Sequence, residues 1–479
     1  MDATAVLSRL EATRNGTRLL EIAAALREAG GRVVLVGGAV RDGLLGLPVK
    51  DLDVEVFDLE YELLAGVLAG FGEVLSIGQA FGVLVVRGLS IDFSLPRRDS
   101  KVAPGHRGFE VEFDPQLPFD EASRRRDLTI NSMGIELATG KLLDPHRGRA
   151  DLEAEVLRAT DPASFGEDPL RALRVAQMAA RFCMTVDPNL IELCATLDLS
   201  ELPGERLYEE FRKLLLKGRE PSRGLSFLRE SRLLHHFPEL EALIDVPQDP
   251  IWHPEGDVWL HTLMAIDSAA RLRELGLGSE SRSESESIED VAFMFAVLCH
   301  DFGKPTTTAK IDGRVRSRGH DQRGAKPTRI FLERLRASTK LTEMTIALVE
   351  QHLAPALLIE QGATPRAYRR LARKLARAGV SMRLLERVAR ADHLGRTTED
   401  ALAGRFEAGD AFVAQADALE VGIEGPKDVV LGRHLIARGL TPSPEFSETL
   451  DRCRDIQYET GLTDPVEILD RVMRNSSST

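Results

Sequence analysis

Two aspartates with alternating spacing carry the strongest chemical signal in this sequence. Asp51 and Asp53 lie in KDLDVEVF, a run that predicts a strand in which every second side chain points to the same face. Two carboxylates on one face can hold a pair of Mg²⁺ ions, one to activate an attacking hydroxyl and the other to neutralise a leaving phosphate. Asp92, in the strand-like run SIDFSL, would be a third carboxylate, unless it is an ordinary solvent-facing strand residue.

A glycine pair precedes these carboxylates. Gly37 and Gly38 follow the strand-like run RVVLV, and their missing side chains would let backbone amides approach a triphosphate at the start of a helix. A glycine pair after a strand is most often a simple turn, and D-x-D is common by chance. The order strand, Gly-Gly, helix, strand with D-x-D is far more specific, and it predicts a metal-dependent site for nucleotidyl transfer.

Two further motifs could grip a nucleotide. In RRDLTIN, Asp127 can accept from a ribose hydroxyl, while Arg126, with Asn131 nearby, can bind phosphates or base edges. In FGEDPLRALR, Asp168 and Arg171 are spaced to share one face of a helix, where acceptors and donors would lie side by side as on a base edge. Taken alone, that second pair would be a surface ion pair.

The second half contains a different set of residues, typical of a metal site. His261 lies in DVWLHTLMAID, and the adjacent His300 and Asp301 lie in FAVLCHDFGKP. Neutral imidazoles and carboxylates are ligands for a divalent metal, and a His-Asp pair on a buried helix is costly without a partner. Asp392, in RADHLGR, closes the set. A lone helical histidine is usually structural, and for His320 and His352 an assisting role and an ordinary surface position are both left open.

The elements that would position these residues change character along the chain. RVVLV (32–36) and LDVEVF (52–57) predict strands, and FGVLVVRGLSIDFSL (81–95) predicts two strands that turn at Gly88. From Asp151 onward the β signal almost disappears and helical spacing dominates. The acidic, low-complexity run SESRSESESIED (279–290) predicts an exposed or disordered loop.

Composition limits the possible classes of protein. The chain has 479 residues, enough for roughly two to four domains, and its 43% hydrophobic and 29% charged residues are typical of a globular protein. We expect a cytoplasmic protein, because no apolar run approaches a membrane span and the four cysteines form no C-x-x-C pair. The net charge of −13 argues mildly against sequence-blind nucleic-acid binding. The basic run from Arg366 to Arg396 is either a solvated helix face or, through Arg373 and Arg377, a guide for RNA phosphates toward Asp392.

Seven motifs together resemble a known family. VGGAVRDGLLG, KDLD, IDFSLPRR, RRRDLTINSM, DPHRG, EDPLRALR and ERLYEEF follow one another between residues 33 and 240, and GRHLIARGLTPSPEF lies near the end. In this order they resemble class II tRNA nucleotidyltransferases, the CCA-adding enzymes of the bacterial poly(A) polymerase-like superfamily. The resemblance implies addition of C, C and A to the 3′ end of tRNA from CTP and ATP, with Mg²⁺ as cofactor.

The same resemblance implies roles for individual residues. Asp51 and Asp53 would hold the metals, with Asp92 as the third catalytic carboxylate. Gly37 and Gly38 would contact the triphosphate, with Arg41 nearby. The segment from Asp99 to Gly108 corresponds to a flexible element that family members need when they switch to adding A, which weakly disfavours a CC-only enzyme. The remaining nucleotide-binding residues, with Asp168 and Arg171 as a protein template for the base, would be Arg126, Asp127, Asn131, Glu167, Asp168, Arg171 and Arg174.

The second half resembles an HD domain. HPEGDVWLHTL, CHDFGKPTT and GHDQRG are similar to the domain carried by one bacterial subgroup of tRNA nucleotidyltransferases, within the HD phosphohydrolase superfamily. The resemblance implies that His261, His300, Asp301 and Asp392 bind a divalent metal, Mg²⁺ or Ni²⁺. It also implies phosphatase, 2′-nucleotidase and 2′,3′-cyclic phosphodiesterase activities, with the metal polarising a phosphoryl oxygen and activating water.

The predicted fold class is α+β. A mixed-sheet, polymerase beta-like nucleotidyltransferase head (1–150) would precede an all-helical neck and body (151–245), an HD domain (246–400) and a helical tail (401–479). Three other functions stay open: addition of A only, poly(A) polymerisation and catalytically inactive RNA binding. The intact Asp51, Asp53 and Asp92 speak against the inactive protein, and the oligomeric state is left open.

Overall fold

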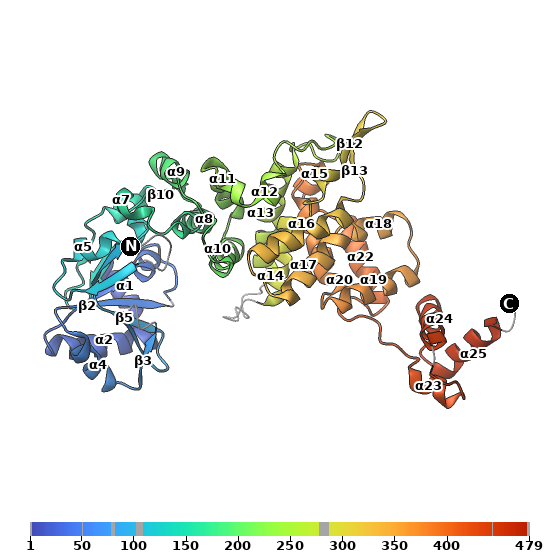
Figure 1. Cartoon of the computed structure of the whole chain (residues 1–479), viewed down its shortest axis with the longest axis horizontal. Helices are drawn as coiled ribbons and strands as arrows, with labels where there is room; N and C mark the ends of the chain where they lie inside the picture. The colour runs from blue at the N-terminus through green and yellow to red at the C-terminus, as the bar shows by residue number, and fades with distance from the viewer. Residues whose placement is uncertain are drawn as a thin grey trace. The chain divides into compact units, whose positions relative to one another are not determined.

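A computed structural model describes residues 2–49, 51–77, 82–101, 109–276, 287–442 and 444–476. Its contacts group into two compact units, one of Met1–Pro203 with Ser226–His236 and the other of Gly204–Leu225 with Phe237–Thr479 (Figure 1). The finer division into four domains stays a prediction. Residues 102–108 of the predicted flexible element and 279–286 of the acidic run lie outside the described residues.

A seven-stranded mixed sheet forms the centre of the first unit. Its strand order is β3-β4-β5-β2-β1-β8-β9, with β2 and β5 parallel and the other neighbours antiparallel. The predicted strands at 32–36 and 52–57 are confirmed as β1 and β2, and the predicted turn at Gly88 separates β4 from β5. The bounds are β1 (Arg32–Val36), β2 (Leu52–Phe57), β3 (Val74–Ile77), β4 (Val83–Val86), β5 (Ile91–Ser94), β8 (Gly134–Glu136) and β9 (Leu142–Leu143).

Helices and short strands complete this unit. The strand pairs β6–β7 and β10–β11 lie outside the main sheet. Helix α8 starts at Leu170, so Asp168 precedes the helix and does not share a helical face with Arg171 as predicted; Pro169 between them stands as its N-cap. The bounds are α1 (Ala3–Glu11), α2 (Arg14–Glu28), α3 (Gly38–Leu44), α4 (Tyr61–Ala69), β6 (Arg97–Lys101), β7 (Phe109–Phe113), α5 (Phe119–Arg124), a 3-10 turn (Thr129–Asn131), α6 (Gly148–Glu153), β10 (Val156–Leu157), α7 (Pro162–Phe165), α8 (Leu170–Phe182), β11 (Thr185–Val186) and α9 (Pro188–Cys194).

The second unit is built almost wholly of helices. Helix α14 is its centre, buried from Val291 to Cys299 and packed against α10, α13, α17 and α20. Helix α11 (Pro221–Glu230) has residues in both units. The other bounds are α10 (Gly204–Lys217), α12 (Pro238–Glu241), α13 (Val258–Gly276), α14 (Ile288–Cys299), α15 (Lys304–Thr307), α16 (His320–Arg334), α17 (Thr339–Gln351), α18 (Ala354–Glu360), α19 (Pro365–Arg377), α20 (Met382–Leu394), α21 (Glu399–Leu402), α22 (Glu407–Ala418), α23 (Gly432–Ala437), α24 (Pro444–Thr460) and α25 (Pro465–Ser476).

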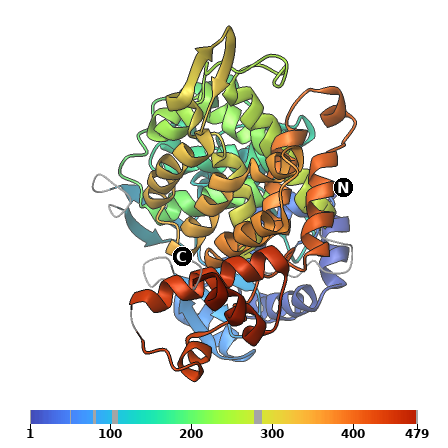
Figure 2. The same ribbon diagram turned by 90° about the vertical axis from the view of Figure 1, so that its right-hand side faces the viewer.

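One element corrects the prediction that this part is all helical. Strands β12 (Thr308–Ile311) and β13 (Arg314–Ser317) form an antiparallel hairpin that projects from the helices (Figure 2). Its turn residues Asp312 and Gly313 have φ of 51° and 78°. An Asp-Gly pair with positive φ at both positions is the preferred turn of a two-residue hairpin, so the signal was present in the sequence.

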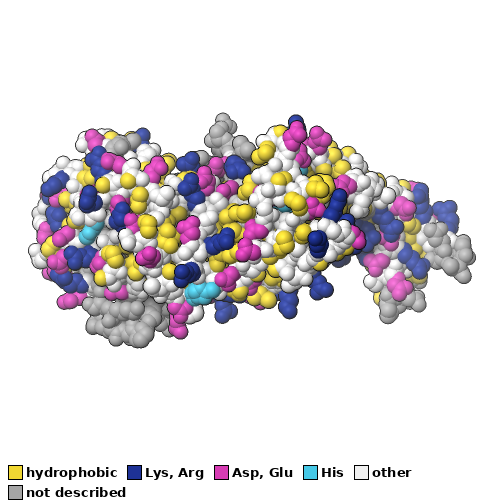
Figure 3. Space-filling model, turned by 90° about the horizontal axis from the view of Figure 1, so that it is seen from above, with side chains coloured by type: hydrophobic (Ala, Val, Ile, Leu, Met, Phe, Trp, Pro, Cys, Tyr) yellow, Lys and Arg dark blue, Asp and Glu magenta, His cyan; other side chains and the backbone are white. Residues whose placement is uncertain are grey.

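The basic run on α19 contacts the C-terminal helices. Arg373 donates to Asp428 at 2.7 Å and to the Tyr458 hydroxyl at 2.9 Å, and Arg369 donates to the Tyr458 carbonyl at 2.7 Å. Arg373 therefore docks part of the tail, whereas Arg377 is exposed. Acidic and basic side chains are intermingled over the face of the molecule shown in Figure 3.

Two expectations from composition can be compared with the structure. Cys194, Cys299 and Cys453 are buried, whereas Cys183 is half-buried. Among the described residues, no helix combines the length and apolar character needed to span a membrane.

Candidate functional site

The three predicted carboxylates lie on neighbouring strands in the middle of the sheet. Asp53 on β2 is the register partner of Asp92 on β5, Asp51 stands just before β2, and all three are exposed. Partial withdrawal from water raises the pKa of Asp53 and of Asp92, and the charge of Asp51 raises both further. Carboxylates that repel one another when ionised are suited to bind a cation between them. In the described structure, however, the oxygen atoms of these three do not all lie within 4.8 Å of one another.

Gly37 makes room for Arg126 beside these carboxylates. Gly37 has a φ of 71°, and a Cβ there would lie 2.7 Å from Arg126 Nη1 and 3.5 Å from Asp53 Oδ2. Its backbone N–H donates to the Met133 carbonyl at 3.3 Å, so that amide is already occupied. The glycine is therefore needed for close packing of a guanidinium against the face that carries these carboxylates.

Glu55 is a site residue that the sequence reasoning missed. It is 1% exposed and accepts from Arg125 Nη2 at 2.7 Å and from Arg126 Nη2 at 3.1 Å. The alternation Asp51, Asp53, Glu55 was the available signal, because it places the third acid on the same face of the strand. Glu55 fixes the guanidinium of Arg126, whose charge in turn lowers the pKa of Asp53 against the effect of burial.

Glu55→Gln should cost about 3 kcal/mol of unfolding free energy, because two guanidinium groups would lose their buried anionic partner. Urea unfolding measures this change. Glu153→Gln is the matched control, since Glu153 makes an exposed ion pair with Arg149 at 2.9 Å, and its loss should change stability by less than about 0.5 kcal/mol. Equal stability of the Glu55 variant and the wild type would contradict the assignment.

Arg41, Asn131 and Asp127 form a buried polar network. Arg41 is 3% exposed and hydrogen-bonds Asn131, while Asn131 Nδ2 donates to Asp127 at 3.0 Å. Asp127 also accepts from Arg174 Nε at 2.6 Å and from the Leu128 amide at 2.8 Å. Burial alone would raise the pKa of Asp127, but the charge of Arg174 and these hydrogen bonds outweigh burial and lower that pKa to about 2.

Arg174→Gln should lower the free energy of unfolding at neutral pH but not near pH 2. A carboxyl whose pKa falls from 3.8 to about 2 on folding contributes stability above pH 3.8, and loses it as the pH falls through about 2. The variant should therefore have a free energy of unfolding about 1 kcal/mol lower than the wild type at neutral pH. This value allows for screening by solvent around the partly exposed Arg174. The difference should vanish as the pH approaches about 2. Thermal unfolding between pH 2 and pH 6 measures it. Asp127→Asn has no carboxyl at this position, so the stability of this variant should not change with pH in this way. If the stability difference between Arg174→Gln and the wild type is the same at every pH, the Asp127 carboxyl is not its cause.

The predicted base-reading residues lie at the start of α8. Arg171 donates to the carbonyls of Ser164 at 3.0 Å and Arg125 at 2.6 Å, and Asp168 accepts from the Leu170 amide at 3.2 Å. Glu167, Asp168 and Arg171 are all half-buried. The hydrogen bond from Arg171 to the Arg125 carbonyl links the predicted base-template residues to Arg125, whose side chain donates to Glu55.

The histidines and aspartates of the second unit meet in a buried cluster. His261, on α13, is 0% exposed, and its Nε2 lies 3.0 Å from Asp392 Oδ1. His300 Nε2 lies 3.2 Å from Asp301 Oδ2 and 3.9 Å from Asp392 Oδ1. All four predicted ligands are therefore brought together from α13, α20 and the end of α14.

His320 and His352 join this cluster and are not surface residues. They are 8% and 1% exposed, and their Nε2 atoms lie 3.3 Å apart. Asp301 belongs to two groups whose ligand atoms lie within 4.8 Å of one another, one with His261 and His300 and the other with His320 and His352. The arrangement therefore offers two adjoining metal positions that share Asp301.

Backbone carbonyls fix the protonation of three of these rings. The Nδ1 atoms of His300, His320 and His352 lie 2.7 Å from the carbonyls three residues earlier, at Val297, Ser317 and Val349. A carbonyl only accepts, so each Nδ1 is the donor, and in the neutral form of each ring Nε2 then directs a lone pair into the cluster. Burial, with the neighbouring imidazoles, lowers the pKa of His352 to about 3, so this ring stays neutral.

The lone pairs and carboxylates of the cluster fit divalent cations. In neutral rings that carry their proton on Nδ1, the Nε2 atoms of His320 and His352 face each other as two acceptors 3.3 Å apart. Buried Asp301 makes no hydrogen bond of good geometry through either oxygen. A cation would satisfy all of these acceptors. Glu255, also missed in the sequence, accepts from His261 Nδ1 at 2.8 Å and so turns His261 Nε2 toward the cluster.

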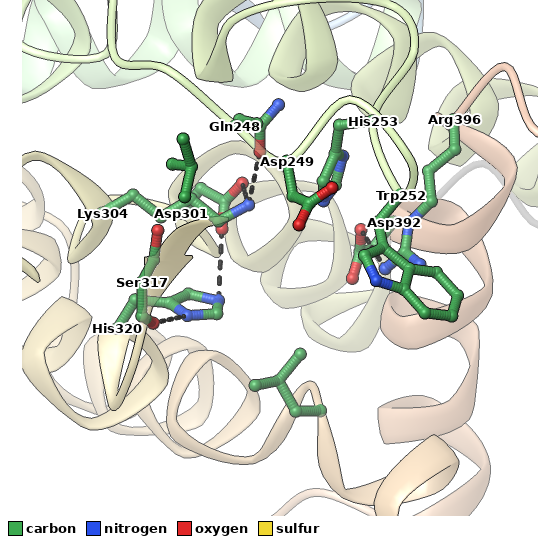
Figure 4. Close-up of a pocket in the computed structure, with 12 residues that line it drawn as sticks. Gln248, Asp249, Trp252, His253, Asp301, Lys304, Ser317, His320, Asp392 and Arg396 are labelled. Carbon is green, nitrogen blue, oxygen red and sulfur yellow. Dashed lines mark hydrogen bonds and ion pairs between the residues drawn. The ribbon is translucent and has the colours of Figure 1, made fainter. Parts of the chain in front are cut away.

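A cavity of about 230 Å³ opens onto this cluster (Figure 4). Asp301, His320 and Asp392 line it together with two cations, Lys304 and Arg396. Lys304 Nζ lies 2.7 Å from Asp301 Oδ2 and donates to Gln248 Oε1 at 2.7 Å. A site with metal ligands and two cations is suited to a phosphate ester.

The fold and the carboxylates of the first unit define a nucleotidyltransferase head. The family described as the Poly A polymerase head domain matches residues 33–158, and the family described as a probable RNA and SrmB-binding site of polymerase A matches residues 185–244.

Curated relatives identify the family more narrowly. A multifunctional CCA protein from Thioalkalivibrio sulfidiphilus is 36% identical, over 67% of this chain and 74% of its own length. One from Burkholderia cenocepacia is 32% identical, over 88% of this chain and 97% of its own length. The chain belongs to the multifunctional CCA protein family.

A solved structure shares the fold. The CCA-adding enzyme of Bacillus stearothermophilus, solved in complex with CTP, has a TM-score of 0.67 and 21% identity, and the match covers 97% of this chain and 98% of that one.

Proposed function

We propose that this chain adds C, C and A to the 3′ end of tRNA, using CTP and ATP. Its membership of the multifunctional CCA protein family supports the substrates. The observation that carries the proposal is the pairing of Asp53 with Asp92 on adjacent parallel strands, with Asp51 beside them and Arg126 packed under Gly37. Members of this superfamily act with divalent metal ions, and we assign Mg²⁺ to the three carboxylates.

In the proposed reaction, the 3′-hydroxyl oxygen of the tRNA bonds to the α-phosphorus of the nucleotide. The bond from the α-phosphorus to the bridging oxygen breaks, pyrophosphate leaves, and the hydroxyl proton passes to solvent. The cations held by Asp51, Asp53 and Asp92 would supply positive charge for this transfer. Arg126, held by Glu55, would bind the triphosphate, and Asp168 with Arg171 would present the polar groups that select the base.

Three tRNA transcripts test this function: one ending before the first C, one ending after both Cs, and one complete. CTP and ATP are supplied separately and together. Incorporation of C into the first transcript, followed by C and A, is the expected result. Failure on the first transcript with addition of A to the second would replace the proposal with the A-adding form, and long A tracts would indicate a poly(A) polymerase.

We also infer a metal-dependent phosphohydrolase in the predicted HD region, residues 246–400. Two groups of candidate metal ligands share buried Asp301, and each group contains two histidine rings. These groups favour the second activity. Divalent ions, Mg²⁺ or Ni²⁺, would polarise a phosphoryl oxygen when bound. Arg396 and Lys304 would orient the ester in the cavity while water attacks phosphorus and the leaving alcohol takes the proton. The substrates would be phosphomonoesters, 2′-nucleotides and 2′,3′-cyclic phosphates.

A further inference from the structure

An exposed tryptophan lines the cavity of the second unit. Trp252 lines the cavity and is 59% exposed, and its neighbour Ile251 is 61% exposed (Figure 4). Two adjacent large apolar side chains in water beside a polar cavity are unusual, since such groups normally lie in the core. Their exposure at this place indicates a surface that a ligand covers.

The loop that carries Trp252 is held by hydrogen bonds. The backbone N–H groups of Trp252 and His253 donate to the Asp249 carbonyl at 3.1 and 2.9 Å. The Gln248 side chain donates to the carbonyls of Gly256 at 3.3 Å and Asp257 at 3.1 Å. The indole is therefore displayed from an ordered turn, and its exposure does not come from an unanchored loop.

A partly exposed cation lines the same cavity. Arg396 is 21% exposed and reaches Asp392 Oδ1 only at 3.5 Å, which is a weak hydrogen bond. A guanidinium with available donors recognises phosphate oxygens, and an exposed aromatic ring offers a face on which a base can stack. Together, Arg396 and Trp252 match the two chemically different ends of a nucleotide.

We propose that Trp252 is the stacking platform for the nucleobase of the substrate hydrolysed in this cavity. The site would thus take a nucleotide, or the last nucleotide of an RNA, in preference to a phosphate ester without a base. The inference rests on the proposed phosphohydrolase, because Asp301 and Asp392 line the same cavity. Trp252 would act on binding and would leave the bond-breaking step to the buried cluster.

A binding experiment tests the platform without requiring turnover. The chain has two tryptophans, and the other, Trp259, is 1% exposed, so a stacked base should quench the fluorescence of Trp252 alone. Neither tryptophan lies in the first unit, which holds the head. We expect 2′,3′-cyclic AMP to quench the full chain, glycerol 1,2-cyclic phosphate to leave it unchanged, and Trp252→Phe to abolish the quenching.

Hydrolysis of the same two compounds supplies the second measurement. Trp252→Ala should raise KM for the cyclic nucleotide about tenfold and leave KM for glycerol cyclic phosphate unchanged, while Trp252→Phe should stay near the wild type. Leu402→Ala is the control, because Leu402 is an apolar side chain 72% exposed outside the cavity. An equal effect on both substrates, or no quenching by the nucleotide, would overturn the platform.

The two proposals fail separately. Quenching by the nucleotide with no hydrolysis of either compound would remove the phosphohydrolase and retain Trp252 as a base-binding residue. Hydrolysis of both compounds with no quenching, and unchanged kinetics in Trp252→Ala, would retain the phosphohydrolase and remove the platform.

Discussion

Replacing Asp51 and Asp53 together with alanine should abolish nucleotide incorporation into tRNA, by about a thousandfold or more. The two carboxylates stand beside Asp92 on the exposed face of the sheet, and losing them removes the ligands for cations that would offset the charge of the transferred phosphate. Such charge stabilisation is worth several kcal/mol, and about 4 kcal/mol corresponds to roughly a thousandfold in rate. Incorporation of labelled CTP and ATP, with tRNA binding measured in parallel, tests this.

Binding of tRNA should survive in that double variant, because the replaced side chains would hold cations and not the RNA. Glu62→Ala is a suitable control, since Glu62 is an exposed acid on α4 of the same unit and should leave the rate unchanged. Incorporation retained by the double variant would sink the assignment of the first unit.

Asp301→Asn should eliminate the phosphohydrolase, also by about a thousandfold, and leave CCA addition intact. Asp301 is shared by both ligand groups, and a neutral amide presents its NH₂ where an anionic oxygen is needed. Metal content measured by elemental analysis should fall in the variant, and hydrolysis of a 2′,3′-cyclic nucleotide should disappear. Retained CCA addition shows that the first unit of the variant is folded.

A matched substitution controls for the chemical change itself. Asp312→Asn makes the same exchange at the exposed hairpin turn, where φ is 51° and asparagine is well tolerated. It should change neither metal content nor hydrolysis. If Asp301→Asn keeps its metal and its hydrolysis, the cluster is structural.

The sequence predicted the first unit well where a simple period governs the side chains. The bounds of β1 and β2 are those expected, because burial on a pleated strand has a period of two that can be counted. Glu55 follows the same period but was missed, since a third acid on that face becomes meaningful only when Arg125 and Arg126 arrive from far along the chain.

The second unit shows what spacing alone does not determine. His320 and His352 lie on different helices from His300, and only tertiary packing brings their Nε2 atoms together. The sequence motifs and their resemblance to an HD domain predicted His261, His300, Asp301 and Asp392 as ligands. They did not predict Glu255, which precedes α13 and contacts His261. The basic run was interpreted by charge alone, and the packing of Arg373 against Asp428 and Tyr458 assigns part of it to holding the tail.

The single strand that carries both Asp53 and Glu55 also constrains how this gene can change in length. Leu52, Val54 and Val56 fill the core from the opposite face and are 2%, 1% and 0% exposed. Inserting or deleting one codon between Asp53 and Glu55 would turn one of the two acids into that core and separate Asp53 from the guanidinium groups that Glu55 holds. A substitution on this strand alters one side chain, whereas inserting one residue turns every following side chain to the opposite face and should disrupt the packing of the head.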